Sequence, residues 1–235
     1  MSLIKKARRE EAKLKFSLAG PSGSGKTYSA LLFAKGFMGS LEKVVVVDTE
    51  NGSAHLYDDL GEYSVLAFAP PYEPNRYMSA IDICIAEGFE FIILDSITPE
   101  WEGEGGCLDI HKVYTKSMRD SFRAWNEVTP LHNKFLEKIK SANAHILSTV
   151  RKKQDYVMEE NNGKKKVTKV GLKDQTRDGF EYEVTLGFNL DMNHLAEISK
   201  DRTSMFYDGV PFMIGEDTGI KVREWNNGAK RENEQ

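Results

Sequence analysis

The stretch Gly20-Pro21-Ser22-Gly23-Ser24-Gly25-Lys26-Thr27 decides the fold. It fits G-x-x-x-x-G-K-[ST], the phosphate-binding P-loop. Apolar residues alternate at 14–19 as in a β-strand, and they recur at helical spacing at 28–37. A strand, a glycine-rich loop and a helix are the context that this motif requires. The sequence therefore predicts a nucleotide-binding loop rather than an accidental glycine-rich turn.

Each position of this loop has an expected role. Backbone N–H groups converge on phosphate oxygens, and the helix N-terminus adds its partial positive charge. Lys26 should reach the β- and γ-phosphates, and the Thr27 hydroxyl should ligate Mg²⁺. The expected cofactors are therefore ATP and Mg²⁺. The expected nucleotide contacts are Gly20, Pro21, Ser22, Gly23, Ser24, Gly25, Lys26, Thr27 and Tyr28.

The composition is that of an ordinary globular chain. It has 235 residues, of which 40% are hydrophobic and 29% are charged. No apolar run approaches the roughly eighteen residues of a membrane span, and 1–15 lacks the apolar core of a secretory signal. Cys84 and Cys107 have no metal-binding spacing and fit ordinary packing in a reducing cytoplasm, the expected location. The net charge of −4 is no overall nucleic-acid signature.

Four further apolar strands are predicted, and two of them end in acids. The β-branched run 43–48 ends in Asp48-Thr49-Glu50, and the run 89–94 ends in Asp95, the Walker B pattern. A third strand is expected at 144–150, and a shorter one at 65–68. Strands this apolar are typical of a parallel sheet covered on both faces. We therefore predict an α/β fold, a mainly parallel twisted sheet flanked by helices, with Asp95 opposite Thr27 at a Mg²⁺ site.

Between these strands, the sequence predicts helices and one long loop. A helix is expected at 75–87, and 97–120 is expected to be irregular. Residues 121–141 should form a helix that breaks or begins near Pro130. Its expected inward residues are Phe122, Trp125, Phe135, Leu136 and Ile139. His145, at the entrance of the strand that follows, is expected to be structural.

Residues 151–177 concentrate positive charge. They hold nine basic and four acidic residues, with Asn161-Asn162-Gly163 between two β-like arms. This pattern predicts a hairpin that contacts a phosphate backbone, although lysines on a solvated edge also discourage aggregation. The candidate nucleic-acid contacts are Lys152, Lys153, Lys164, Lys165, Lys166 and Lys169.

The C-terminal part alternates in two segments. Residues 180–189 and 194–200 should pair as an antiparallel hairpin around 191–193, with Lys200 and Arg202 at the end of its second strand. We expect a charged arm at 1–13, a single ATPase domain at 14–224 and a polar, disordered tail at 225–235.

The motifs resemble the RecA/RadA-type ATPase core over roughly 14–206. The resemblance rests on the P-loop, on Asp48-Thr49-Glu50, on Asp95-Ser96, on the strand ending in Ser148-Thr149, and on Lys200-x-Arg202. Because the chain is short, it is most similar to phage RecA-like recombination ATPases, often grouped as phage AAA-family nucleotide-binding proteins. It departs from RecA in having Ser148 or Thr149 where a sensor glutamine or asparagine is expected, which can shift γ-phosphate sensing to Arg151.

The resemblance implies an activity and partners. Glu50 would polarise the attacking water, and Lys200 and Arg202 would act as a finger on the ATP of a neighbouring subunit. The implied assembly is a homo-oligomer, ring or filament. It would act on single-stranded DNA in phage-type recombination or strand annealing in the phage or bacterial host cytoplasm, with a single-strand-binding protein as a candidate partner. DNA-stimulated ATP hydrolysis is the implied activity.

Two alternatives remain open at this point. One is a P-loop kinase of a small substrate, with the basic stretch 151–177 as its lid. The other is a non-enzymatic protein whose assembly is gated by nucleotide. A partitioning ATPase with a deviant Walker motif is disfavoured, because Pro21-Ser22 offers no early second lysine.

Overall fold

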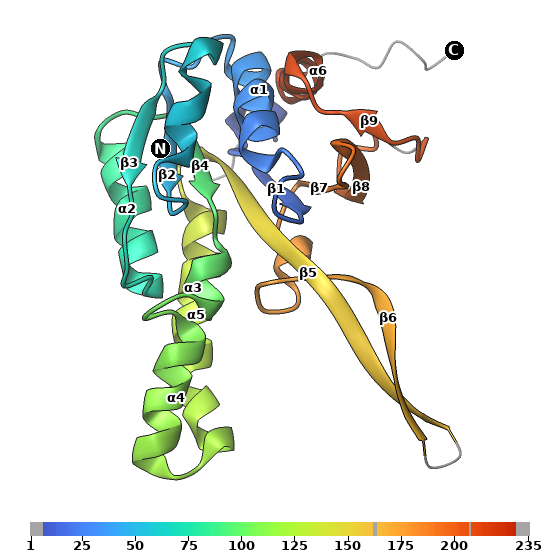
Figure 1. Cartoon of the computed structure of the whole chain (residues 1–235). Helices are drawn as coiled ribbons and strands as arrows, with labels where there is room; N and C mark the ends of the chain where they lie inside the picture. The colour runs from blue at the N-terminus through green and yellow to red at the C-terminus, as the bar shows by residue number, and fades with distance from the viewer. Residues whose placement is uncertain (1–6, 162–163, 207, 229–235) are drawn as a thin grey trace.

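One sheet organises the molecule (Figure 1). The computed structural model describes residues 7–161, 164–206 and 208–228, with the backbone alone for Glu11 and 154–171. Nine strands from these residues follow the order β3-β2-β4-β5-β1-β7-β8-β9, with β6 paired to β5. Six strands are parallel: β1 (Lys15–Gly20), β2 (Val44–Asp48), β3 (Ser64–Ala67), β4 (Phe91–Asp95), β5 (His145–Asn161) and β7 (Leu186–Leu190). The predicted α/β fold with a mainly parallel sheet is confirmed.

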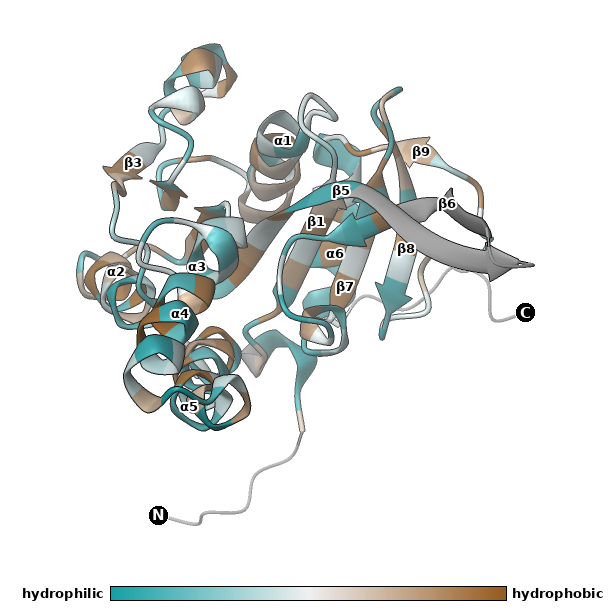
Figure 2. Ribbon diagram, turned by 60° about the horizontal axis from the view of Figure 1, so that its bottom comes forward, coloured by the Kyte–Doolittle hydropathy of each residue, from teal (hydrophilic) through white to brown (hydrophobic). Residues whose placement is uncertain are grey.

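Helices cover both faces of this sheet. Helices α1 (Lys26–Met38) and α6 (Glu216–Asn226) pack on one face, and α2 (Pro74–Ala86) and α5 (Ser121–Ser141) pack on the other. Alternate residues of one strand pack into the hydrophobic cores on opposite faces of the sheet, since Val46 faces the first helix pair and Val47 faces the second. This double burial explains why the strands read as unbroken apolar runs. Figure 2 shows the hydrophobic colour on the central strands.

Two glycines set the closeness of α1 and α6. A Cβ added at Gly36 of α1 would lie 1.9 Å from the carbonyl oxygen of Glu216, and one added at Gly219 of α6 would lie 2.1 Å from that of Phe33. Both distances are far below van der Waals contact, so any side chain at either position would separate the helices. The C-terminal helix therefore seats backbone against backbone on the helix that follows the P-loop.

The segment predicted to be irregular is helical. It forms α3 (Thr98–Glu102) and α4 (Cys107–Met118), and the glycines at 103–106 only separate them. Helix α5 runs unbroken through Pro130, which is exposed on its outer side, so water can satisfy the carbonyl that the proline leaves unbonded. Phe122 is 84% exposed, contrary to expectation, whereas Phe135 and Ile139 face the core as predicted.

A buried polar cluster joins α3, α4 and α5. The Glu100 carboxylate accepts a hydrogen bond from Cys107 Sγ at 3.1 Å and from His132 Nδ1 at 3.0 Å. All three side chains are buried, and their ligand-type atoms lie within 4.8 Å of one another. The Trp101 ring contacts the His132 ring edge-on at 5.1 Å. Because each of these three buried polar side chains has a hydrogen-bond partner, the cluster links the three helices without an unsatisfied group among the atoms named.

Two antiparallel hairpins complete the sheet. Strand β5 continues beyond the core and pairs with β6 (Lys164–Asp174) in the predicted basic hairpin, and the two project away from the body in Figure 1. The C-terminal hairpin is also confirmed, with β7 pairing β8 (Leu195–Asp201), which in turn pairs β9 (Phe212–Met213). Its first strand begins later than predicted, because 180–182 form a short 3₁₀ helix, η3 (Phe180–Tyr182).

The remaining elements are short. Two 3₁₀ helices lie among residues 7–60, η1 (Arg9–Glu11) and η2 (Ser53–Leu60). Helix α6 contains Trp225 and Asn226, which were expected to belong to the polar tail. Residues 229–235 of that predicted tail lie outside the described residues.

Candidate nucleotide site

The P-loop has the predicted shape. Gly23 and Gly25 have φ angles of 83° and 84°, in the left-handed region that favours glycine, and α1 begins at Lys26. Lys26 Nζ donates hydrogen bonds to the carbonyl oxygens of Gly20, at 3.0 Å, and Pro21, at 2.8 Å. Burial lowers the pKa of Lys26, against the opposing effect of the Asp95 and Glu50 carboxylates. The Lys26 ammonium group is thus held by backbone carbonyls of its own loop.

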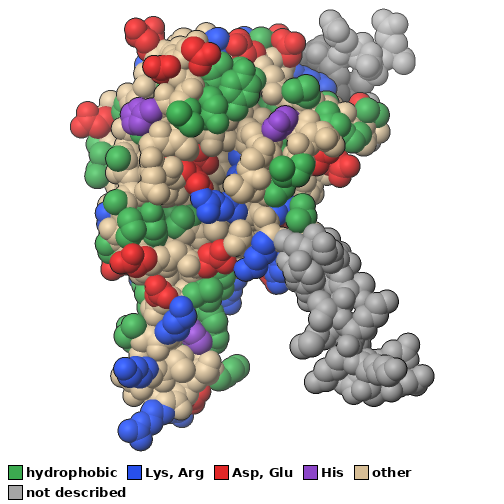
Figure 3. All heavy atoms as spheres, in the orientation of Figure 1, with side chains coloured by type: hydrophobic (Ala, Val, Ile, Leu, Met, Phe, Trp, Pro, Cys, Tyr) green, Lys and Arg blue, Asp and Glu red, His purple; other side chains and the backbone are tan. Residues whose placement is uncertain are grey.

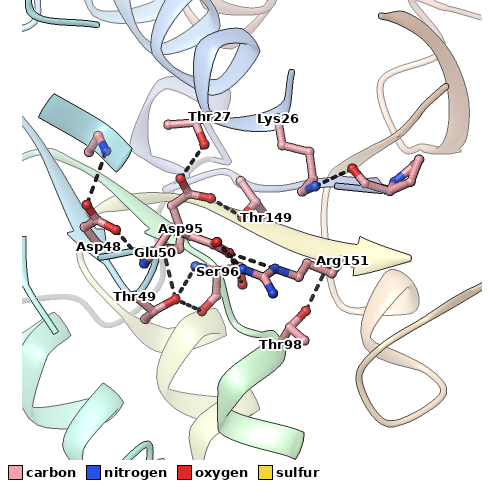
Figure 4. Close-up of polar contacts among 12 residues, drawn as sticks. Lys26, Thr27, Asp48, Thr49, Glu50, Asp95, Ser96, Thr98, Thr149 and Arg151 are labelled. Carbon is pink, nitrogen blue, oxygen red and sulfur yellow. Dashed lines mark hydrogen bonds and ion pairs between the residues drawn. The ribbon is translucent and has the colours of Figure 1, made fainter. Parts of the chain in front are cut away.

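Thr27 and Asp95 meet as the sequence predicts (Figure 4). Thr27 Oγ1 donates to Asp95 Oδ2 at 2.6 Å, and Thr149 Oγ1 donates to Asp95 Oδ1 at 2.5 Å. Burial raises the pKa of Asp95, which is 1% exposed, while these two hydroxyls oppose the shift. A hydroxyl and a carboxylate side by side are hard oxygen donors, which suit Mg²⁺. The hydroxyl of Thr149, a candidate sensor, is therefore hydrogen-bonded to the Walker B aspartate.

Asp48 shapes the loop that carries Glu50. Its Oδ1 accepts the Glu50 N–H at 2.6 Å, and its Oδ2 accepts the Ala54 N–H at 3.2 Å. Thr49 Oγ1 in turn accepts the Ser96 N–H at 2.8 Å, which ties the end of β2 to the end of β4. Both side chains are buried. Asp48 and Thr49 are thus positioning groups, and Glu50 alone of the three turns toward the cleft.

Glu50 forms an ion pair with Arg151. Arg151 Nε donates to Glu50 Oε1 at 2.9 Å and its Nη2 contacts Oε2, so both carboxylate oxygens are engaged (Figure 4). Glu50 is the first cause of the raised pKa of Arg151. The Arg151 backbone N–H is held by Thr98 Oγ1 at 2.9 Å. Arg151 was considered as a phosphate sensor from sequence, but its pairing with Glu50 has no signal in the sequence.

The cleft beside the P-loop extends past these charged groups. It has a volume of about 560 Å³, and Figure 3 shows the surface hollowed on this face. Its wall includes residues that sequence reasoning missed: Leu32, Tyr57, His194, Met213 and Ile214. A Cβ at Gly25 would lie 3.0 Å from His194 Nδ1, so the β7–β8 turn sits over the loop. Tyr28, which was predicted to contact nucleotide, packs against Tyr57, with the centroids of the two rings 5.6 Å apart.

The predicted nucleic-acid residues lie on the β5–β6 hairpin. Lys152 pairs with Asp174 at 3.1 Å and its side chain is 14% exposed, so it is poorly placed to reach a phosphate. Lys153 is exposed and lies 3.4 Å from Glu102. The side chains of Lys164, Lys165, Lys166 and Lys169 lie outside the described residues.

The predicted finger lies far from the P-loop of its own chain. Leu186, at the start of β7, pairs with both Phe16 and Asp201, so the end of β8 is at the sheet edge opposite Gly20. Lys200 Nζ contacts the Tyr182 carbonyl and lies 5.8 Å from the Tyr182 ring. Arg202 is exposed. These residues are therefore not brought to the nucleotide site within one subunit.

Comparison with known proteins identifies the family. No helix among residues 7–161, 164–206 and 208–228 combines the length and apolar character needed to cross a bilayer. The comparison with curated proteins found no significant match. Residues 12–225 match a family described as an AAA domain, which covers the P-loop, β4 and both hairpins. With its phosphate loop, Walker B aspartate and parallel sheet, the chain belongs to this AAA-type P-loop ATPase domain family.

Proposed function

We propose that this protein hydrolyses ATP and acts on single-stranded DNA in phage-type homologous recombination or strand annealing. The observation that carries the proposal is the meeting of the P-loop, Asp95 and the Glu50–Arg151 pair in one cleft. The basic hairpin leaves the sheet at Arg151 itself, which supports a link between DNA and the cleft.

The chain supplies position and charge for hydrolysis. The backbone N–H groups of the loop and Lys26 hold the phosphates, and Thr27 and Asp95 would hold Mg²⁺, which neutralises charge on the phosphoryl oxygens. Glu50 orients the attacking water and accepts its proton. Arg151 occupies one acceptor site on each Glu50 oxygen and stabilises the ionised carboxylate, so a shift of Arg151 toward the γ-phosphate would leave Glu50 more basic.

A single set of assays tests this function. ATP turnover is measured with and without single-stranded DNA over a range of protein concentrations, with Lys26→Ala as the inactive control. We expect turnover in the wild type, its stimulation by DNA and its loss in the control. Slow turnover that DNA leaves unchanged would instead indicate nucleotide-gated assembly. Transfer of phosphate to an added small acceptor would indicate a kinase.

A further inference from the structure

A helical arm projects from the body at a distance from the basic hairpin (Figure 1 and Figure 2). It consists of α4 and the first half of α5, joined at Arg119 and Asp120, and it points downward in Figure 1, where β5 and β6 diverge from it toward the lower right. Asp120 Oδ1 accepts the Arg123 N–H at 3.0 Å and caps α5, so the turn is well formed. The Glu100 cluster holds the base of the arm, and the His111 ring stacks on the Trp125 ring at 3.9 Å between its two helices.

The end of this arm exposes apolar side chains. We call it the arm tip and define it as Val113, Lys116, Met118, Arg119, Phe122 and Arg123. Phe122 is 84% exposed, Val113 68% and Met118 40%. An aromatic ring left this open at a well-ordered turn stabilises nothing within the chain, so a contact outside the chain accounts for it better.

Cations surround these apolar groups. Lys112 pairs with Asp109 at 2.8 Å, and Arg123 lies 3.6 Å from Asp120. Lys116 and Arg119 are exposed, and neither forms an ion pair with any residue of the described segments. Figure 3 shows basic side chains gathered at the end of the arm. The arm tip is thus positive in a chain whose net charge is −4.

The combination of exposed cations and apolar side chains at the arm tip indicates what kind of molecule binds there. Protein interfaces are rich in arginine and aromatic residues but depleted of lysine, and here the exposed Lys112 and Lys116 flank the apolar groups. Sites for single-stranded nucleic acid combine cations along the backbone with aromatic rings that stack on bases. We propose that the arm tip is a second contact for single-stranded DNA, with Phe122 stacking on a base and Lys116 and Arg119 contacting phosphates. This inference rests on the proposed function and extends it to a surface outside the β5–β6 hairpin.

Binding of a labelled oligothymidylate to the full chain, followed by fluorescence anisotropy at several salt concentrations, tests the arm tip. Phe122→Leu keeps an apolar side chain but cannot stack, so affinity should fall roughly five-fold or more, while Phe122→Trp should bind like the wild type. Arg119→Glu should weaken binding and reduce the salt slope by about 0.7. Lys134→Glu, an equal charge change on the exposed side of α5, should have a much smaller effect.

The outcomes separate this inference from the proposed function. If the wild type binds the oligonucleotide and all tip variants bind equally well, the arm tip is not a DNA contact, but the proposed function stands. If tip variants keep their DNA affinity but change the sedimentation of the protein, the tip joins copies of this chain and the inference is wrong. If the wild type does not bind DNA with or without ATP, the DNA part of the proposed function fails first.

Discussion

Glu50 is the residue on which hydrolysis should depend most. Glu50→Gln preserves the shape of the side chain but removes its capacity to accept a proton from water. We expect ATP binding to remain and turnover to fall by roughly 100-fold or more. Equilibrium binding and steady-state turnover measure the two effects, with Glu87→Gln on the surface as the matched control. Turnover within a few-fold of the wild type would show that Glu50 is not the base.

His145 should make the fold sensitive to acid. Burial lowers its pKa from 6.5 to about 3, and its Nδ1 accepts the Leu14 N–H at 3.1 Å, which requires the neutral ring. Between these two pH values the unfolded chain binds a proton that the folded chain does not. The free energy of unfolding should therefore fall as the pH drops from 6.5 to 3, by at most about 1.4 kcal/mol per pH unit.

Urea unfolding at several pH values tests this contribution. His145→Asn keeps a hydrogen-bond acceptor without the titrating ring, so its stability should depend less steeply on pH than that of the wild type between pH 6.5 and 4. His55→Asn, at an exposed position, should leave the pH dependence unchanged. Equal slopes for His145→Asn and the wild type would assign the acid sensitivity to other groups.

The close contact between α1 and α6 decides whether Gly219→Ala raises or lowers the free energy of unfolding. Helix propensity alone would make Gly219→Ala stabilising by about 1 kcal/mol. The added methyl would instead meet the Phe33 carbonyl oxygen at 2.1 Å, so we expect a loss of roughly 1–3 kcal/mol in the free energy of unfolding. Gly36→Ala should behave in the same way. Chemical denaturation measures both, and a gain in stability would mean that the two helices separate freely.

Elements with a strong pattern were predictable, and elements set by tertiary contacts were not. The P-loop, β2 and β4 follow from unbroken apolar runs and a specific motif. Helices α3 and α4 were missed because the glycines at 103–106 mimic a long loop, although they only end one helix and begin the next. Phe122 was assigned to the core from its hydrophobicity, while the arm places it beyond the core.

The candidate site shows the same division. Thr27 and Asp95 were predictable because each belongs to a motif with fixed geometry. The Glu50–Arg151 pair was not, because it joins residues about one hundred positions apart, at the ends of strands that lie on either side of β4. His194 lies in the β7–β8 turn with a φ of 64°, and this conformation brings its ring to the P-loop. No local sequence pattern predicts this contact.

Assembly is the prediction that concerns the whole molecule. Arg202 is exposed at the sheet edge opposite the P-loop, so it can meet a triphosphate only in another subunit. Turnover per molecule should therefore rise with protein concentration, and Arg202→Ala should lower turnover while barely changing ATP affinity. A finger of this kind contributes about 10³–10⁵ in rate.

Mixing two inactive variants tests whether the finger acts between subunits. Arg202→Ala retains Glu50, and Glu50→Gln retains Arg202, so a mixed assembly contains some sites with both groups intact. We expect part of the activity to return on mixing and none in either variant alone. Activity that is independent of concentration, with no recovery in the mixture, would place Arg202 in a surface turn of a protein that works as a monomer.

The position of β1 in the sheet bears on how the chain can be made. β1 precedes the other described strands in the chain, yet its two neighbours are β5 and β7, which are synthesised more than one hundred residues later. Until 186–190 emerge, one edge of β1 has no strand to pair with, and until 216–226 emerge α1 lacks the helix that packs against it. The P-loop therefore reaches its final form only after strands and a helix that lie much later in the chain have been synthesised.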